Sequence, residues 1–73
     1  MTVGTRELPV VVNGERCAVP GGTTVADLVA QRCASPDGIA VARNREVVPR
    51  STWSSTALAG GDRVEIVTAA AGG

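Results

Sequence analysis

Lysine, histidine, phenylalanine and tyrosine are all absent from this chain of 73 residues. Without histidine and lysine, the chain has neither the usual general base at neutral pH nor the amine that forms Schiff bases. Its serine hydroxyls therefore have no imidazole to activate them. A chain this short also has one small core and no second lobe to enclose a deep substrate cavity. We therefore expect that the protein is not an enzyme in its own right.

Cysteine is scarce, and its spacing does not fit a metal site. Cys17 and Cys33 lie sixteen residues apart, with no CxxC pair and no imidazole to complete a tetrahedral site. A disulfide between them is sterically open but is not indicated in a chain without a secretion signal. We expect no bound metal and two buried structural thiols, because free cysteine is among the most buried residue types.

Neither sign of charge predominates. Seven arginines balance seven acidic residues, and the formal net charge is zero. A surface that binds phosphate backbones requires excess positive charge, so we expect no nucleic-acid partner. The longest apolar run is far shorter than a membrane span, and the first residues lack the order of a secretion signal. These features predict a cytoplasmic protein without a membrane partner, and its net polarity and small size predict a monomer.

Short apolar runs separated by turn residues predict about five strands. Asn13-Gly14 is the strongest hairpin signal, since both residues accept positive φ, and Asn44-Arg45 is a second tight-turn candidate. The predicted strands cover residues 8–12, 15–19, 39–41, 46–48 and 63–68.

One helix is predicted between the second and third strands. Thr24 is a suitable N-cap, and Asp27 places a carboxylate in the first turn. The helix then presents one apolar stripe, formed by Val25, Leu28, Val29 and Cys33. The Ser/Thr-rich residues 50–58 are expected to be irregular, with a single helical turn around Trp53.

The order of these elements predicts an α+β fold of the β-grasp, or ubiquitin-like, type. A hairpin, a helix and further strands suit a mixed sheet with one helix packed across one face. The first and last strands are expected to lie centrally and parallel, because a crossover brings the later strands back beside the first. We expect this domain to cover residues 8–68, between a flexible N-terminal extension (1–7) and a flexible C-terminal tail (69–73).

Two features have both a structural and a functional interpretation. Trp53 is the only aromatic residue, and it is either a lid over one end of the core or an anchor for a partner. The sequence ends on Gly72-Gly73 after three alanines, and only the terminal carboxylate in this segment can react. The segment is either an inert tail or a reactive arm. Its extended reach of about 17 Å suits entry into a narrow pocket of another protein.

The residues resemble the ThiS family, the small sulfur carriers of thiamine thiazole biosynthesis, over residues 8–73. Three segments in this order make the resemblance specific: Val-Pro-Arg-Ser-x-Trp, the strand Gly-Asp-x-Val-Glu-Ile, and the diglycine end. The matching segments are 11–15, 24–28, 38–44, 47–53, 61–67 and 69–73.

The resemblance implies that the chain carries sulfur on its C-terminus. An E1-like adenylyltransferase of the ThiF type would use ATP and Mg²⁺ to convert the Gly73 carboxylate to an acyl-adenylate. Sulfur from a cysteine-desulfurase persulfide would then leave a thiocarboxylate, which thiazole synthase would consume. The chain itself would bind no cofactor. The implied functional residues are Gly72 and Gly73, with partner contacts from Ala70, Ala71, Trp53 and Arg50.

Three other functions remain open. A sulfur carrier of the MoaD type, for molybdopterin, shares the fold and the diglycine end, although its tail is typically more aromatic. A ubiquitin-like modifier would be conjugated to target lysines through Gly73. A passive binding domain would have an inert tail.

Overall fold

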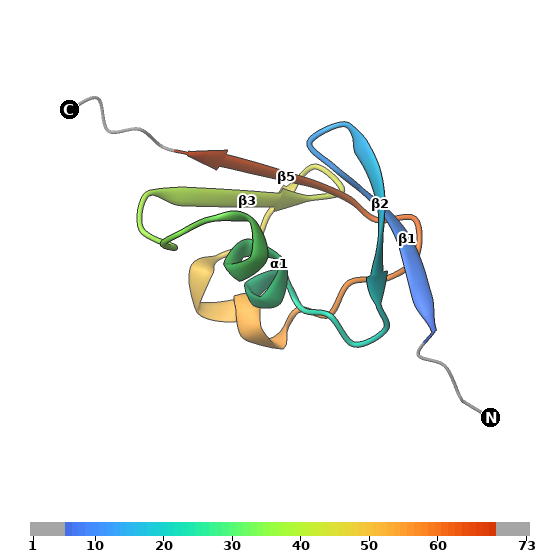
Figure 1. Cartoon of the computed structure of the whole chain (residues 1–73). Helices are drawn as coiled ribbons and strands as arrows, with labels where there is room; N and C mark the ends of the chain where they lie inside the picture. The colour runs from blue at the N-terminus through green and yellow to red at the C-terminus, as the bar shows by residue number, and fades with distance from the viewer. Residues whose placement is uncertain (1–5, 69–73) are drawn as a thin grey trace.

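The computed structural model describes residues 6–68, and over this range the chain forms a five-stranded mixed sheet with one α-helix (Figure 1). The strand order is β2-β1-β5-β3-β4, with β1 and β5 parallel and the other neighbours antiparallel. The predicted β-grasp fold, with the first and last strands central and parallel, is confirmed. The elements are β1 (Glu7–Val12), β2 (Glu15–Pro20), α1 (Val25–Arg32), β3 (Ile39–Arg43), β4 (Glu46–Val47), the 3₁₀ helix η1 (Arg50–Ser55) and β5 (Arg63–Thr68).

Both predicted tight turns are present, and both use residues with positive φ. Asn13 and Gly14 have φ values of 51° and 84° between β1 and β2. Asn44 and Arg45 have φ values of 52° and 72° between β3 and β4. Two central residues with positive φ match the twist of the flanking strands, so these turns set the register of each hairpin.

The helix α1 begins as its sequence predicts. The Thr24 hydroxyl accepts from the Asp27 N–H, and the Asp27 carboxylate accepts from the Thr24 N–H, both at 3.1 Å. This reciprocal pair satisfies two N–H groups that the first helical turn would otherwise leave without partners. Val25, Leu28 and Val29 are buried against the sheet, which confirms the predicted stripe except for its last member.

The expectation of two buried thiols is wrong. Cys17 and Cys33 are both free and only partly buried. Cys33 is the C-cap of α1 and has an extended backbone conformation. Its side chain therefore does not continue the buried stripe of the helix. Cys17 lies on edge strand β2, and the Arg32 guanidinium is 3.7 Å from its Sγ. Both thiols therefore sit at the margin of the core.

The core lies between the sheet and a layer formed by α1 and η1 (Figure 1). Residues 50–55 form a 3₁₀ helix longer than the predicted single turn, in which Ser and Thr side chains donate to backbone carbonyls. Every buried side-chain N or O atom within residues 6–68 has a hydrogen-bond partner. The buried apolar residues are Val10, Val12, Val19, Val25, Leu28, Val29, Val41, Val48, Trp53, Leu58 and Val64.

The first and last strands lie at the two ends of the described range. β1 begins at Glu7, one residue before the predicted boundary, and β5 ends at Thr68. Most of the predicted N-terminal extension (1–7) and all of the predicted tail (69–73) lie outside the described residues. Within residues 6–68, the structure contains no helix with the length and apolar character of a membrane span.

Candidate functional site

The strand β5 leads directly to the predicted reactive end of the chain. Gly72 and Gly73, and the predicted partner contacts Ala70 and Ala71, lie outside the described residues. The structure does show how the chain approaches them. β5 pairs with β3 from Val64 to Thr68, and its last residue, Thr68, is the partner of Ile39. The end of β5 is therefore paired with the beginning of β3.

On its other side, β5 pairs with β1 only at its first two residues. The ladder joins Val11 to Arg63 and Val12 to Val64, and Asn13 N–H donates to the Val64 carbonyl at 2.9 Å. The Asn13 side chain then continues this pairing. Its Nδ2 donates to the Ile66 carbonyl at 3.2 Å, and its Oδ1 accepts from the Ile66 N–H at 2.8 Å. The Asn13 side chain in the β1–β2 turn is thus hydrogen-bonded to β5 at Ile66, two residues before the strand ends.

A buried carboxylate fixes the start of β5. Asp62 accepts hydrogen bonds from Arg43 Nε at 2.7 Å, from Asn44 Nδ2 at 3.0 Å and from the Ala59 N–H at 2.8 Å. Burial raises the pKa of the Asp62 carboxyl group, but these hydrogen bonds and the Arg43 charge favour the charged form more strongly. The pKa of Asp62 therefore lies below its ordinary value. The network joins the β3–β4 turn to the residue that precedes β5.

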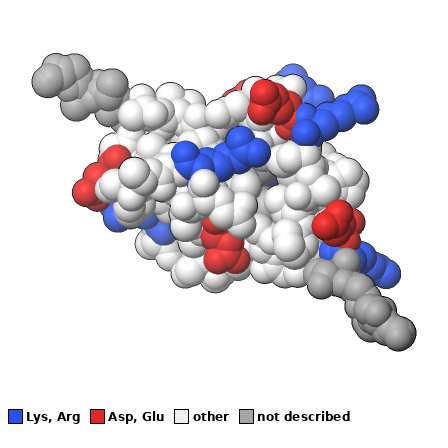
Figure 2. Space-filling view, viewed as in Figure 1, with Lys and Arg blue, Asp and Glu red and all other residues white. Residues whose placement is uncertain are grey.

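The sheet face opposite the helix layer exposes apolar side chains next to the path to the tail. Val67 on β5 is 57% exposed, and Val47 on β4 is 77% exposed. The strand pairing places Ala40 beside Val67 and Ala42 beside Val47, so each valine has a small cross-strand neighbour. On the face shown in Figure 2, acidic and basic side chains lie close together in several places, and uncharged surface separates these mixed groups.

The structure brings together the two side chains predicted to contact partners. The Arg50 guanidinium carbon lies 6.0 Å from the centroid of the Trp53 ring. Trp53 is only 5% exposed, and its Nε1 donates to the Val48 carbonyl at 2.9 Å. Trp53 is therefore placed as a lid over the core would be. Only a small part of its side chain is open to contact with a partner.

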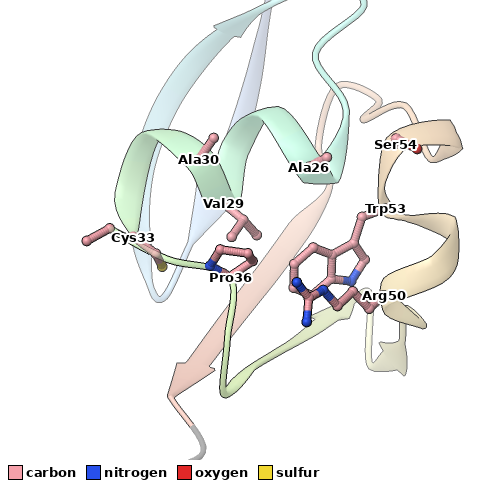
Figure 3. A pocket seen from close by; sticks show the side chains of 9 residues that line it. Ala26, Val29, Ala30, Cys33, Pro36, Arg50, Trp53 and Ser54 are labelled. Carbon is pink, nitrogen blue, oxygen red and sulfur yellow. The ribbon is translucent and has the colours of Figure 1, made fainter.

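That part of Trp53 lines a pocket of about 380 Å³ between α1 and η1 (Figure 3). This pocket was not predicted from the sequence. Its only signal in the sequence is the four-residue spacing of Ala26 and Ala30, which leaves this side of the helix without large side chains at both positions. The lining residues are Ala26, Val29, Ala30, Cys33, Ala34, Pro36, Arg50, Trp53 and Ser54.

Metal-binding side chains are dispersed in this fold. Within residues 6–68, no group of three His, Cys, Asp or Glu residues lies close enough to hold a metal ion. Asp62, the most buried carboxylate, already accepts three hydrogen bonds.

The fold and the approach to the tail define a β-grasp domain whose central strand leads to a diglycine terminus. Residues 10–73 match the model of the ThiS family, so the chain belongs to that family. A crystal structure of a thiamine biosynthesis protein (ThiS) from Geobacter metallireducens has the same fold, with a TM-score of 0.74 and 30% sequence identity. The match covers 90% of this chain and 100% of that one.

A curated relative is a thiazole synthase from Paramagnetospirillum magneticum. It is 35% identical over 66 residues, which cover 90% of this chain and 20% of that protein. The chain thus spans about a fifth of the length of this relative.

Proposed function

We propose that this protein is a sulfur carrier for the formation of the thiamine thiazole, and that the Gly73 carboxylate holds the sulfur. The observation that carries the proposal is the match to the ThiS family, which extends over the β-grasp domain and the diglycine end to residue 73. The structural similarity to a ThiS protein, over the whole of that chain, supports it.

The proposed chemistry requires only the terminal carboxylate of this chain. A carboxylate is a poor electrophile, so an E1-like adenylyltransferase of the ThiF type first joins it to AMP, using ATP and Mg²⁺. The outer sulfur of a cysteine-desulfurase persulfide then attacks the acyl-adenylate and displaces AMP, which forms an acyl disulfide. A second thiol cleaves this acyl disulfide, leaving a thiocarboxylate on Gly73 and a disulfide between that thiol and the desulfurase cysteine. In this scheme the chain is a carrier and co-substrate that binds no cofactor of its own.

The tail composition suits entry into an enzyme. Ala69 to Gly73 carry no side chain larger than a methyl group, and their extended reach is about 17 Å. Thr68 pairs with Ile39, and the Asn13 side chain forms hydrogen bonds with Ile66. These contacts fix the position of the strand from which the tail extends. The folded domain then provides the surface that partner enzymes recognise.

Thiazole synthase is the proposed recipient of the sulfur. The similarity of this chain to a segment of a thiazole synthase supports the assignment to that enzyme. The cytoplasmic location and the monomeric state expected from the sequence belong to the same proposal.

ATP-dependent activation tests this function. The protein is incubated with ATP, Mg²⁺ and a ThiF-type adenylyltransferase, and pyrophosphate exchange is measured. The expected result is exchange with the full chain and none with a chain that lacks Gly72 and Gly73. Equal exchange with both chains would contradict the proposal.

A further inference from the structure

We propose that the pocket between α1 and η1 is a docking site for the enzyme that activates the tail. Its proposed occupant is an apolar side chain flanked by a carboxylate on the surface of that enzyme. The inference rests on the proposed function, because it assumes that the tail is activated by another protein. It adds a second contact surface, on the helix side of the domain, to the tail itself.

The walls of the pocket suit an apolar side chain. α1 contributes methyl groups from Ala26 and Ala30, and η1 contributes the Trp53 ring from the opposite side (Figure 3). The pocket volume of about 380 Å³ lies at the lower end of the range for ligand sites. Because Trp53 is held by its bond to the Val48 carbonyl, this wall is already in place before a partner binds.

The charge at the pocket identifies the chemistry of the partner. Arg50 is the only charged residue among the nine that line the pocket, all of which lie within residues 6–68. Its Nη1 is 3.6 Å from Asp37 Oδ1, and the two side chains are 59% and 84% exposed. An exposed pair at this distance contributes little stability, so a carboxylate of a partner can replace Asp37 at low cost. A carboxylate beside the inserted apolar side chain would complement Arg50.

The pocket also lies near the base of the tail. Pro36, at its rim, accepts a hydrogen bond from the Ile39 N–H at 3.3 Å, and Ile39 is the strand partner of Thr68. An enzyme that takes up the residues after Thr68 must approach this end of the domain. It therefore meets the Pro36 and Arg50 side of the pocket.

The activating enzyme is the occupant that we propose, because in the proposed function it is the first protein to take up the tail. A preformed pocket lowers the cost of ordering the two surfaces in that encounter.

Two exposed substitutions test the inference. Ala30→Arg fills the pocket with only a small loss of helix propensity, and Arg50→Glu reverses its charge. Gln31→Arg is the matched control for bulk on the exposed surface of α1, because Gln31 does not line the pocket. Arg6→Glu is the matched control for charge, and Arg6 is exposed and also lies outside the pocket. Unfolding in urea verifies that all four variants retain the fold.

The readout is ATP–pyrophosphate exchange by a ThiF-type adenylyltransferase as a function of carrier concentration. We expect both pocket variants to raise the KM for the carrier at least tenfold with kcat unchanged, and both controls to stay within twofold. We also expect added salt to raise the KM of the wild-type carrier but not that of Arg50→Glu, since screening weakens only an existing ion pair.

A KM within twofold of wild type in both pocket variants would overturn the inference and leave the proposed function intact. An equal increase in the controls would also overturn it. A wild-type carrier that is not activated at all would instead contradict the proposed function.

Discussion

The side chain of Asn13 forms two hydrogen bonds with the backbone of Ile66, 53 residues further along the chain. Nδ2 donates to the carbonyl at 3.2 Å, and Oδ1 accepts from the N–H at 2.8 Å. The amide thereby replaces the strand residue that β1 would supply if it continued. Its position, with φ at 51°, is one that asparagine adopts more readily than most residues. One residue thus forms the β1–β2 turn and extends the pairing of β5 toward the tail.

Asn13→Gly separates these two contributions. Glycine adopts the same positive φ without strain, so the variant loses only the hydrogen bonds to Ile66. We expect the free energy of unfolding to fall by about 1–2 kcal/mol, measured by urea denaturation. Hydrogen exchange of the Ile66 amide should also become faster. If Asn13→Gly unfolds at the same urea concentration as wild type, the side-chain contact does not stabilise β5.

Asp62 predicts a specific response to acid. Because its pKa is lowered in the folded protein, its contribution to stability is present above the ordinary aspartate pKa of about 3.9. That contribution is lost as the pH falls through the lower folded-state value. We expect stability to decrease below about pH 4 as the carboxylate is protonated and its bond to Arg43 weakens.

Asp62→Asn is the matched variant for this prediction. It keeps the shape of the side chain but places an amide among the donors from Arg43, Asn44 and Ala59. We expect it to cost about 2–3 kcal/mol at pH 7 and to have a weaker dependence on pH between 5 and 2. Thermal unfolding across this pH range measures both effects. Parallel pH profiles for the variant and the wild type would assign the acid sensitivity to other carboxylates.

The indole N–H of Trp53 supplies a third prediction. Trp53→Phe keeps an apolar ring in the core but leaves the Val48 carbonyl without its donor at 2.9 Å. We expect a loss of about 1–3 kcal/mol from this unsatisfied buried acceptor and the smaller ring. Circular dichroism in urea measures it, because the variant has no tryptophan fluorescence. An unchanged midpoint would show that the hydrogen bond contributes nothing to stability.

The fold was predictable from the sequence because local signals fixed each of its parts. Asn13-Gly14 specified a tight turn because both residues tolerate positive φ, and this turn is present. In the second turn Asn44 supplies this tolerance, and Arg45 also adopts a positive φ of 72°. Thr24 and Asp27 specified the start of α1 through a capping interaction over three residues. The central parallel pair followed from the crossover connection, which has few alternatives in a chain of this length.

The contacts that shape the candidate site were not predictable in this way. The bonds from Asn13 to Ile66 and from Arg43 to Asp62 join residues 53 and 19 positions apart, and no local pattern specifies such pairs. The same limit applies to the pocket, which needs the position of η1 relative to α1. The prediction that both cysteines are buried was wrong. It relied on the general tendency of free cysteine to be buried, which does not show where the edge of a particular core lies. The diglycine end was identified by resemblance and chemistry, and it lies outside the described residues.

The terminal glycine should tolerate no side chain. Gly73→Val adds a branched Cβ where the carboxylate must enter a narrow nucleotide site, so we expect activation to be abolished. Because the substitution lies beyond the last strand, the urea midpoint should match that of wild type. Normal pyrophosphate exchange with Gly73→Val would contradict a narrow channel for the tail.

The central claim, that Gly73 carries sulfur, is tested most directly by a mass spectrum of the C-terminal tryptic peptide. Cleavage after Arg63 releases residues 64–73, which contain no Met, Cys or Trp, so common oxidations of those residues cannot imitate the signal. The protein is first incubated with ATP, a ThiF-type adenylyltransferase, a cysteine desulfurase and cysteine. We predict a gain of about 16 mass units, from the exchange of one oxygen for sulfur, located at Gly73 by fragmentation. An unmodified peptide in the presence of active partner enzymes would contradict the account.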